Sequence, residues 1–436
     1  MQTDPPPAPV PYLHREVQAR EELGHTAVSP TVAGLLAGLF LGLVVGVPAL
    51  QLTGGWAGGN PFRQLAESLP GAMEASRQEG LWSANRTLLA SMNRFEDRLE
   101  EESWVVERLL PPVQGVLTGV LGVGNQQVYT GRDGWLFYRP AVDSLTGPGF
   151  LGSGVLAARR AGGDAWEAPV EPDPLPALLG LARDLERRGI RLLVLPVPVK
   201  AAIHPERLTR RPARPPLRNP SFGELVRSLE AAGIEVLDLG PLLTEAARRE
   251  GRPQYLATDT HWAPGGMDAA ARAVAGWVER RLPPGRTRAY RSEERTVRGI
   301  GDIARMLRLP AGQRLYPPQD VTVTRVSEPD GSPWRSDLEA EILLLGDSFT
   351  NVFSQPDLGW GSGAGFAEQL SLRLQRPIDR IAVNAGGAHA SRQSLTRALA
   401  AGEDRLAGKR LVIYEFSARE LAVGDWRRLG LAPGGD

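Results

Sequence analysis

Short apolar runs alternate with amphipathic stretches over most of the chain after residue 170. The apolar runs lie at 190–198, 234–239, 341–346, 378–383 and 411–416. Continuous apolar runs of this length are typical of strands that are buried on both faces. The amphipathic stretches predict helices over 178–188, 222–232, 241–250, 266–280, 365–374 and 392–401. Strands that alternate with helices in this way predict an α/β fold with a doubly wound parallel sheet and right-handed crossovers.

Three other segments of this region have different patterns. Residues 128–138 contain an Asp-Gly pair between two short, aromatic-rich runs, which predicts a β-hairpin. Residues 147–174 are rich in Gly, Ala and Pro, and we expect a mobile loop or insertion there. The pattern weakens over 287–330, where 299–307 are predicted as a loop leading into a short helix.

The N-terminal part begins with a polar tail and a long apolar segment. Residues 1–30 are Pro-rich and lack apolar periodicity, which predicts a disordered tail on the cytoplasmic side. Residues 31–52 carry no charge, and about 20 helical residues cross a bilayer core, so we predict one transmembrane helix. A secretory signal is the alternative, but this apolar run exceeds the usual core of about 7–15 residues and starts late.

Arginines near this segment predict its orientation. Arg15 and Arg20 precede it and Arg63 follows, a positive-inside bias that predicts a single-pass protein with its C-terminal part outside the cytoplasm. Residues 53–122 carry apolar side chains largely at spacings of three and four, which predicts amphipathic helices forming a linker. The remaining residues, 123–436, are predicted to form the catalytic domain.

Composition narrows the function. The chain of 436 residues has 50 basic and 50 acidic side chains, so its charge does not point to nucleic acid as a partner. It contains no cysteine, which excludes disulfides, thiol catalysis and cysteine zinc sites.

A candidate nucleophile follows the most apolar run. Residues 341–345 lead directly into Gly346, Asp347 and Ser348. Ligands of open α/β sheets bind at the carboxyl ends of the strands, so Ser348 is placed where a nucleophilic hydroxyl would act. Asp347 and Ser348 are also favourable helix N-cap residues, so a purely structural role as helix caps stays open.

A candidate base and its orienting acid lie upstream. Asp259 and His261 are two residues apart, so in an extended segment their side chains project the same way. Asp259 would then hold Nδ1 of His261 while Nε2 faces a serine. The same pattern also fits a hydrogen-bonded loop histidine or a pair of metal ligands. No second His or Cys cluster lies nearby to complete a zinc site, so neither a metal nor another cofactor is predicted.

A Gly-rich turn at 384–390 supplies candidate oxyanion donors. The backbone N–H groups of Gly386 and Gly387, with that of Ser348, would stabilise the oxyanion of an acyl transfer if the turn neighbours Ser348. The alternative is a plain β-to-α turn that requires positive φ.

These motifs together resemble a known family. Gly-Asp-Ser after a buried strand, an Asp-x-His pair and an Asn-x-Gly turn resemble the SGNH-hydrolase fold. The Asp-x-His pair precedes the serine here, whereas it follows the serine in ordinary members. This permuted order, with the segments 134–138, 197–201 and 301–303, resembles the periplasmic alginate O-acetyltransferase family over about residues 120–430.

The resemblance implies an activity and partners. It implies that a Ser-His-Asp triad takes an acetyl group onto Ser348 and passes it to a hydroxyl of an exported polysaccharide. It also implies a membrane-bound O-acyltransferase as the acetyl supplier, and a protein of the inner membrane whose catalytic domain faces the periplasm. If water accepts the acetyl group instead, the chain is a carbohydrate acetylesterase. If the triad is vestigial, the chain is a polysaccharide-binding scaffold.

Two departures limit the resemblance, and several residues are candidates for substrate contact. The last strand exits through residues 415–419 without the Asn of ordinary SGNH enzymes, and no C-terminal carbohydrate-binding module is recognisable. The candidates for substrate contact are Trp135, Tyr138, Trp262, Trp360, Asn384 and Arg419, although the aromatic residues need no function if they are core residues. An arginine-rich stretch at 207–214 would attract an anionic glycan, but such stretches more often form a solvated face.

Overall fold

The structure, a computed structural model, describes residues 29–53, 103–162 and 170–431, and six scattered residues. These six are Pro70, Asn85, Leu89, Ser91, Met92 and Phe95. Almost all of the predicted tail at 1–30 and most of the predicted linker at 53–122 therefore lie outside the described residues. The chain divides into two compact units, 1–109 and 110–436, and each is described by itself.

The N-terminal unit contains the predicted apolar helix. Helix α2 (Pro30–Thr53) confirms the expected secondary structure over 31–52. Its residues 30–47 have a mean hydropathy of 2.1, and the helix is long and apolar enough to cross a membrane. A signal sequence near an N-terminus meets the same criterion, so the helix alone does not distinguish the two. Helix α5 (Trp104–Gly119) contains the boundary between the two units.

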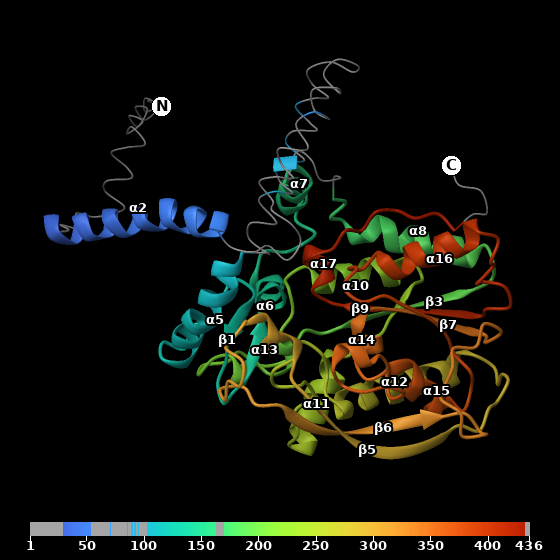
Figure 1. The fold of residues 1–436 in the computed structure, drawn as a ribbon. Helices are drawn as coiled ribbons and strands as arrows, with labels where there is room; N and C mark the ends of the chain where they lie inside the picture. Colours follow the sequence, from blue (N-terminus) through green and yellow to red (C-terminus); the bar gives the residue numbers. More distant parts are fainter. Residues whose placement is uncertain are drawn as a thin grey trace, which may run out of the picture. The chain divides into compact units, whose positions relative to one another are not determined.

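A five-stranded parallel sheet forms the centre of the C-terminal unit (Figure 1). Its strand order is β4-β3-β9-β7-β8. The strands are β3 (Arg191–Val197), β4 (Glu235–Val236), β7 (Ile342–Gly346), β8 (Asp379–Ala382) and β9 (Leu411–Ser417). The predicted doubly wound parallel sheet is thereby confirmed, and the apolar runs of the sequence are its buried strands.

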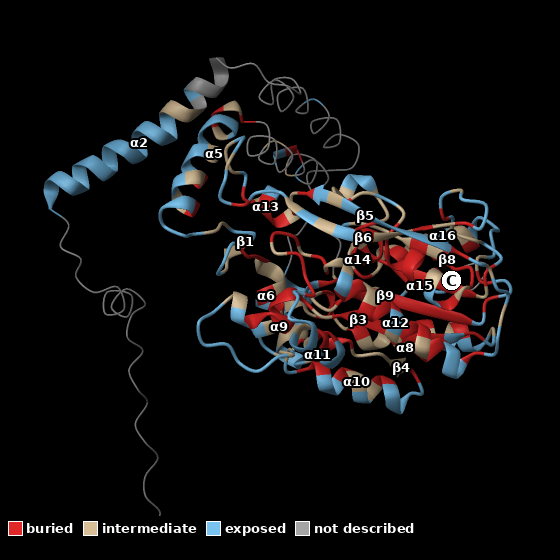
Figure 2. Ribbon diagram, turned by 90° about the horizontal axis from the view of Figure 1, so that it is seen from below, coloured by how far each residue is buried: buried red, intermediate tan, exposed pale blue. Residues whose placement is uncertain are grey.

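Helices cover both faces of the sheet (Figure 1). One face carries α8 (Pro174–Glu186), α10 (Phe222–Ala231) and α16 (Ala390–Ala400). The other carries α11 (Gly240–Glu250), α12 (Pro264–Arg281) and α15 (Phe366–Leu374). Successive residues of β7 alternate between the two cores, since Leu343 packs with the first group and Leu344 with the second. Figure 2 shows the buried residues concentrated along the strands and the helix faces against them.

Shorter elements surround the carboxyl edge of the sheet. They are β1 (Val128–Thr130), β2 (Leu136–Tyr138), α6 (Arg139–Thr146), α9 (Lys200–Ile203), η1 (Pro205–Arg207), α13 (Asp302–Met306), α14 (Ser348–Asn351), η2 (Pro356–Leu358) and α17 (Glu420–Val423). Strands β1 and β2 pair antiparallel, which confirms the predicted hairpin. Asp133 and Gly134 between them have φ of 54° and 76°, the left-handed conformation that an Asp-Gly turn adopts readily.

Two segments differ from the sequence-based expectation. Strands β5 (Arg291–Gly299) and β6 (Gln319–Ser327) form an antiparallel ribbon where no strand is predicted. Most side chains of β5 are exposed and polar, so the strand lacks the alternation that identifies one. Helix α7 (Ser153–Ala161) forms inside 147–174, so the expectation of a loop is wrong there, while 163–169 lie outside the described residues.

Candidate active site

The turn after β7 presents Ser348 at the carboxyl edge of the sheet. Asp347 caps α14, because its Oδ1 accepts a hydrogen bond from Phe349 N (2.7 Å) and its Oδ2 accepts one from Ser417 N (2.8 Å). The N-cap interpretation is thus confirmed for Asp347. Ser348 is instead the first residue of the helix, is half-buried, and makes no side-chain hydrogen bond to another described residue. Its hydroxyl is therefore available for chemistry.

A buried carboxyl group on the neighbouring strand β9 supports the turn that carries Ser348. Glu415 on β9 accepts hydrogen bonds from Asp347 N (3.1 Å) and Thr350 Oγ1 (2.7 Å). Burial raises its pKa well above the ordinary range, and the charge of Asp347 adds to the shift. Position 415 therefore supports the serine turn from inside the protein.

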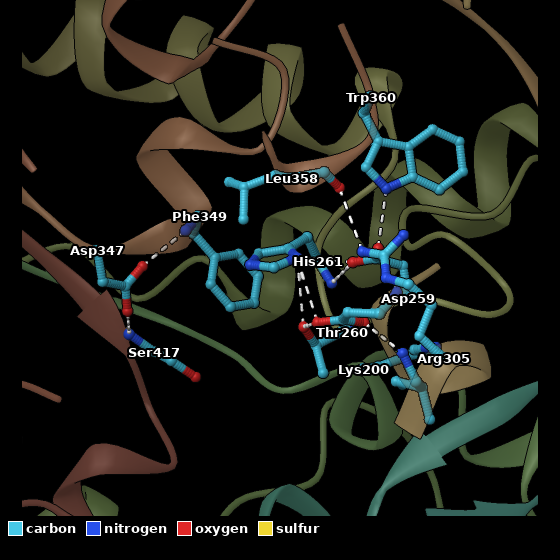
Figure 3. A network of polar contacts seen from close by, with 12 residues as sticks. Lys200, Asp259, Thr260, His261, Arg305, Asp347, Phe349, Leu358, Trp360 and Ser417 are labelled. Atoms are coloured by element: carbon cyan, nitrogen blue, oxygen red, sulfur yellow. Dashed lines mark hydrogen bonds and ion pairs between the residues drawn. The ribbon is translucent and has the colours of Figure 1, made fainter. Parts of the chain in front are cut away.

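Asp259 and His261 contact each other as the sequence predicts. Asp259 Oδ1 lies 2.6 Å from Nδ1 of His261, and both side chains are buried. They lie in the loop between α11 and α12, which is closed by an antiparallel bridge between Tyr255 and Trp262. The bridge holds the loop in a tight turn, so both side chains project to the same side (Figure 3).

Four N–H groups converge on the Asp259 carboxylate. Its Oδ1 accepts from Nδ1 and from the backbone N of His261 (3.0 Å), and its Oδ2 accepts from Asp302 N (3.0 Å) and Trp360 Nε1 (2.8 Å). Trp360 is fully buried, so its indole orients the acid (Figure 3). Sequence reasoning missed this partner, because nothing near Trp360 in the sequence indicates a neighbour at position 259.

The charges of the pair shift both pKa values. Burial raises the pKa of Asp259, but the charge and hydrogen bonds of His261, with the bond from Trp360, outweigh burial and hold that pKa well below its usual range. Burial lowers the pKa of His261, but the negative charges of Asp259, Asp302 and Asp347 outweigh it and raise the pKa. His261 is therefore a stronger base than an ordinary imidazole.

Asp302 is a second acid beside the pair. Its Oδ1 accepts from Thr260 N (2.7 Å), and its Oδ2 lies 3.8 Å from Nδ1 of His261. Burial and the nearby charge of Asp259 raise its pKa. A Cβ at Gly301 would lie 2.0 Å from Thr258 O, so glycine permits this loop to approach the Asp-x-His loop.

Donor atoms of Asp259, His261 and Asp302 lie within 4.8 Å of one another, a spacing that a metal ion also requires. However, each oxygen of Asp259 already accepts two N–H groups, and Nδ1 of His261 faces that carboxylate. This donor set fits a hydrogen-bonded acid–base pair better than a metal site.

Lys200 connects the hairpin to the Asp-x-His loop. Its ammonium group is fully buried and donates to the carbonyl oxygens of Leu136 (2.7 Å) and Ala257 (3.1 Å). Burial lowers its pKa to about 7, against the opposing charges of Asp259 and Asp302. The sequence shows Lys200 as part of a motif but not this role.

The second ring nitrogen of His261 is available. Its Nε2 is buried and forms no hydrogen bond with any described residue, Ser348 included. The ring packs against Phe349, the residue after Ser348, with centroids 4.8 Å apart (Figure 3). Catalytic hydrogen bonds are often long in unliganded enzymes and tighten with substrate, so this geometry is compatible with a serine–histidine pair.

A small cavity, which we call the catalytic cavity, lies beside the Asp-x-His loop and the serine turn. Thr260 and Phe349, neighbours of His261 and Ser348 in sequence, line it together with Tyr138, Lys200 and Arg419. Its volume of about 10 Å³ is room for one water-sized group, so an acetyl group enters only if lining side chains shift. The Arg419 guanidinium lies 5.6 Å from the centroid of the Tyr138 ring.

Trp135, Trp262 and Asn384, which are also predicted to contact substrate, do not line the catalytic cavity. Trp262 is fully buried between Phe349 and Phe366, and Trp135 is also buried. Both aromatic side chains therefore pack in the core and present no free face to a sugar. The Asn384 side chain donates to Gln355 Oε1 (2.7 Å) and accepts from Asn351 (2.9 Å).

The predicted oxyanion turn leaves the same sheet edge as Ser348. Strand β8 pairs with β7, with Ala382 opposite Gly346, and the turn follows immediately. Gly387 has φ of 64°, and a Cβ there would lie 3.1 Å from Glu420 Oε2. The positive φ agrees with the plain-turn interpretation, and the oxyanion role of Gly386 and Gly387 stays a prediction.

A parallel, doubly wound sheet with a serine after one strand and an Asp–His pair beside it defines the class of SGNH-hydrolase-like proteins. Residues 128–418, more than half of the chain, match the family described as "SGNH hydrolase-like domain, acetyltransferase AlgX". The chain belongs to this family of SGNH-like O-acetyltransferases, which confirms the predicted resemblance.

Curated relatives agree with this family. The chain is 31% identical over 180 residues to the "Probable alginate O-acetylase AlgJ" of Pseudomonas fluorescens, covering 39% of this chain and 45% of that protein. It is 27% identical over 311 residues to the protein of the same name from Pseudomonas putida, covering 69% and 71%. The match thus spans about half the length of the first relative.

One solved structure has the same fold. The O-acetyltransferase domain of Pseudomonas putida AlgJ superposes with a TM-score of 0.51 at 24% identity, covering 68% of this chain and 92% of that domain. This similarity agrees with the parallel sheet and its covering helices.

Proposed function

We propose that this chain is a membrane-anchored O-acetyltransferase that moves an acetyl group through Ser348 onto hydroxyls of an exported, alginate-like polysaccharide. The observation that carries the proposal is the buried Asp259–His261 pair: Nε2 of His261 has no hydrogen-bond partner among the described residues, and the ring packs against Phe349, the residue after Ser348. The family membership supports acetyl transfer as the reaction.

In the proposed reaction, Nε2 of His261 takes the proton of Ser348 as Oγ attacks the acetyl carbonyl. The resulting oxyanion accepts hydrogen bonds from Ser348 N and the N–H groups of Gly386 and Gly387. The donor's oxygen leaves with the proton from His261, and an acetyl-serine remains. A sugar hydroxyl, deprotonated by His261, then attacks this ester and restores the serine.

The buried network favours an enzyme over a vestigial scaffold. Burying the Asp259 carboxylate and a histidine of raised pKa costs free energy, so such a pair is expected where it has a function. The four N–H groups fix the carboxylate, and the carboxylate in turn orients His261 as a base. The half-buried Ser348 is also reachable by water, so acetylesterase activity is the second candidate. Of the predicted substrate contacts, Tyr138 and Arg419 keep that role, since both line the cavity.

The cellular setting is part of the proposal. Helix α2 has the length and apolar composition of a membrane anchor. We place the C-terminal unit in the periplasm, where it meets the exported polysaccharide. A membrane-bound O-acyltransferase supplies the acetyl group in this scheme.

Detection of the acetyl-enzyme tests the proposal. The full chain is incubated with an aryl acetate and digested, and the peptide that contains Ser348 is expected to gain the mass of one acetyl group. Addition of alginate oligosaccharides is expected to remove that mass and acetylate the sugar. Acetyl found only as free acetate would assign the esterase instead, and an unmodified Ser348 peptide with active enzyme would refute the acyl-serine.

The raised pKa of His261 gives a pH prediction. The base must be neutral to accept the serine proton, so activity is expected to fall as the pH decreases through a value above about 6.5, the ordinary imidazole pKa. Asp302→Asn removes a negative charge 3.8 Å from Nδ1, which destabilises the imidazolium and lowers its pKa. The acidic limb of kcat/KM against pH is therefore expected to move to lower pH.

The asparagine keeps the contacts of Asp302. Its amide oxygen still accepts from Thr260 N, and its NH₂ group can donate to Thr260 Oγ1. Asp320→Asn, on the exposed ribbon, is the control and should leave the limb in place. An acidic limb that does not move in Asp302→Asn would show that this carboxyl does not tune His261.

A further inference from the structure

A second and larger cleft lies beyond α9 from the catalytic cavity. Four arginines line it, and we call it the arginine cleft: Arg207, Arg214, Arg248 and Arg252. Its volume is about 450 Å³, within the range of ordinary ligand sites and far larger than the catalytic cavity. The proposed reaction uses none of its residues.

The cleft carries an excess of positive charge. Arg207 pairs with Asp133 (2.7 Å) and Arg248 with Glu245 (2.6 Å). Arg214 and Arg252 are exposed, and neither forms an ion pair with any residue that the structure describes.

One acid also lines the cleft, and two further cations precede it. Glu206 is in the lining, and its Oε1 lies 3.1 Å from Nδ1 of His204. Arg210 and Arg211 are exposed on the loop before Arg214 and likewise lack an ion pair within the described part of the chain. The positive charge around the cleft therefore exceeds the negative charge.

Helix α9 separates the cleft from the catalytic cavity. Lys200 and Ala201 at its start line the cavity, whereas Ile203 at its end and His204 line the cleft. Four helical residues rise about 6 Å, so the two sites are close neighbours on one molecule. An extended ligand bound in the cleft is therefore long enough to reach the neighbourhood of the catalytic cavity.

We propose that the arginine cleft binds carboxylate groups of the acceptor polysaccharide, outside the catalytic cavity, while a hydroxyl farther along the same chain reaches Ser348. This inference rests on the proposed function for the acceptor being a polysaccharide. A guanidinium group matches a carboxylate with paired hydrogen bonds, and a cleft lined by one sign of charge concentrates the opposite sign. The unpaired arginines come from two separate segments, around 214 and 252, which fits charges spaced along a polymer better than one compact anion.

Binding to a catalytically inactive chain tests the cleft. Full-length protein carrying Ser348→Ala is titrated by calorimetry with alginate oligosaccharides and with uncharged oligosaccharides of the same length. We expect binding of the charged ligand alone, weakened by added salt. Adding Arg214→Gln with Arg252→Gln is expected to weaken it about tenfold, as loss of two carboxylate contacts.

A matched control distinguishes binding in the arginine cleft from non-specific attraction by any exposed arginine. Arg280→Gln with Arg397→Gln removes two exposed arginines on α12 and α16 and is expected to leave the affinity unchanged. With Ser348 intact, the cleft variant is expected to release acetyl from an aryl acetate at the wild-type rate. Equal weakening by both arginine pairs, or unchanged binding in the cleft variant, would overturn the proposal.

The two proposals fail in different ways. If the cleft has no such role, the aryl acetate is still hydrolysed and alginate affinity does not depend on Arg214 and Arg252. If Ser348 is not the nucleophile, the Ser348→Ala variant still hydrolyses the aryl acetate, and binding to the arginine cleft is unaffected.

Discussion

Ser348→Ala is expected to lower kcat for acetyl release from an aryl acetate by about 10⁶-fold. The substitution removes the atom that forms the acetyl ester in the proposed reaction. Ser417, at the end of β9, also lines the catalytic cavity, but its hydroxyl accepts a hydrogen bond from Arg419 (3.1 Å). The Ser348 side chain is half-buried and makes no hydrogen bond with described residues, so the free energy of unfolding should change by about 0.5 kcal/mol or less. Chromophore release by the purified full chain measures the rate, and thermal unfolding measures stability.

Ser362→Ala is the matched control for this experiment. Ser362 is exposed in the segment between η2 and α15, and its loss should leave the rate unchanged. A Ser348→Ala protein that keeps a rate within tenfold of the wild type would contradict the acyl-serine mechanism.

Asp259→Asn is expected to lower kcat by about 10⁴-fold. An amide facing Nδ1 favours the His261 tautomer with its proton on Nε2, which then cannot accept from Ser348. The substitution should also destabilise the fold by about 1–3 kcal/mol, because four N–H groups converge on the carboxylate and an NH₂ group must face some of them. Rates at saturating aryl acetate and urea unfolding curves measure the two effects.

Trp360→Phe distinguishes the effect of the Asp259 charge from the effect of the hydrogen bonds that hold its carboxylate. It removes one N–H donor but leaves the Asp259 carboxylate and the His261 tautomer in place, so kcat should fall far less than in Asp259→Asn. Equal losses in the two variants would mean that the packing of the loop, rather than the charge of Asp259, sets the rate.

The sheet was predictable from the sequence because its strands are buried on both faces. Continuous apolar runs such as 341–346 can be recognised from neighbouring residues alone, and β7 covers almost the same residues. Strand β5 was not predictable, since its exposed polar side chains carry no periodic signal. The Asp259–His261 contact spans only two residues and was therefore predictable as well.

The rest of the site depends on contacts between distant positions. Trp360 and Asp302 reach Asp259 across 101 and 43 residues of sequence, and no local pattern encodes such a pairing. We predicted sugar contact for Trp135 and Trp262 because aromatic side chains can either stack on sugars or pack in the core. Only the burial of the two side chains in the structure distinguishes these roles.

The position of Lys200 has a consequence for how the site assembles. The backbone N–H of Leu136 on the hairpin donates to Ala257 O, and the ammonium group of Lys200, the first residue of α9, donates to the carbonyl oxygens of both residues. Segments separated by more than a hundred residues must therefore meet before the loop that carries Asp259 and His261 is fixed. Because contacts between distant segments form slowly in folding, the catalytic pair becomes ordered only when the beginning of the domain has returned to its middle. Catalytic activity is thus expected to appear only after these distant segments of the domain have come together.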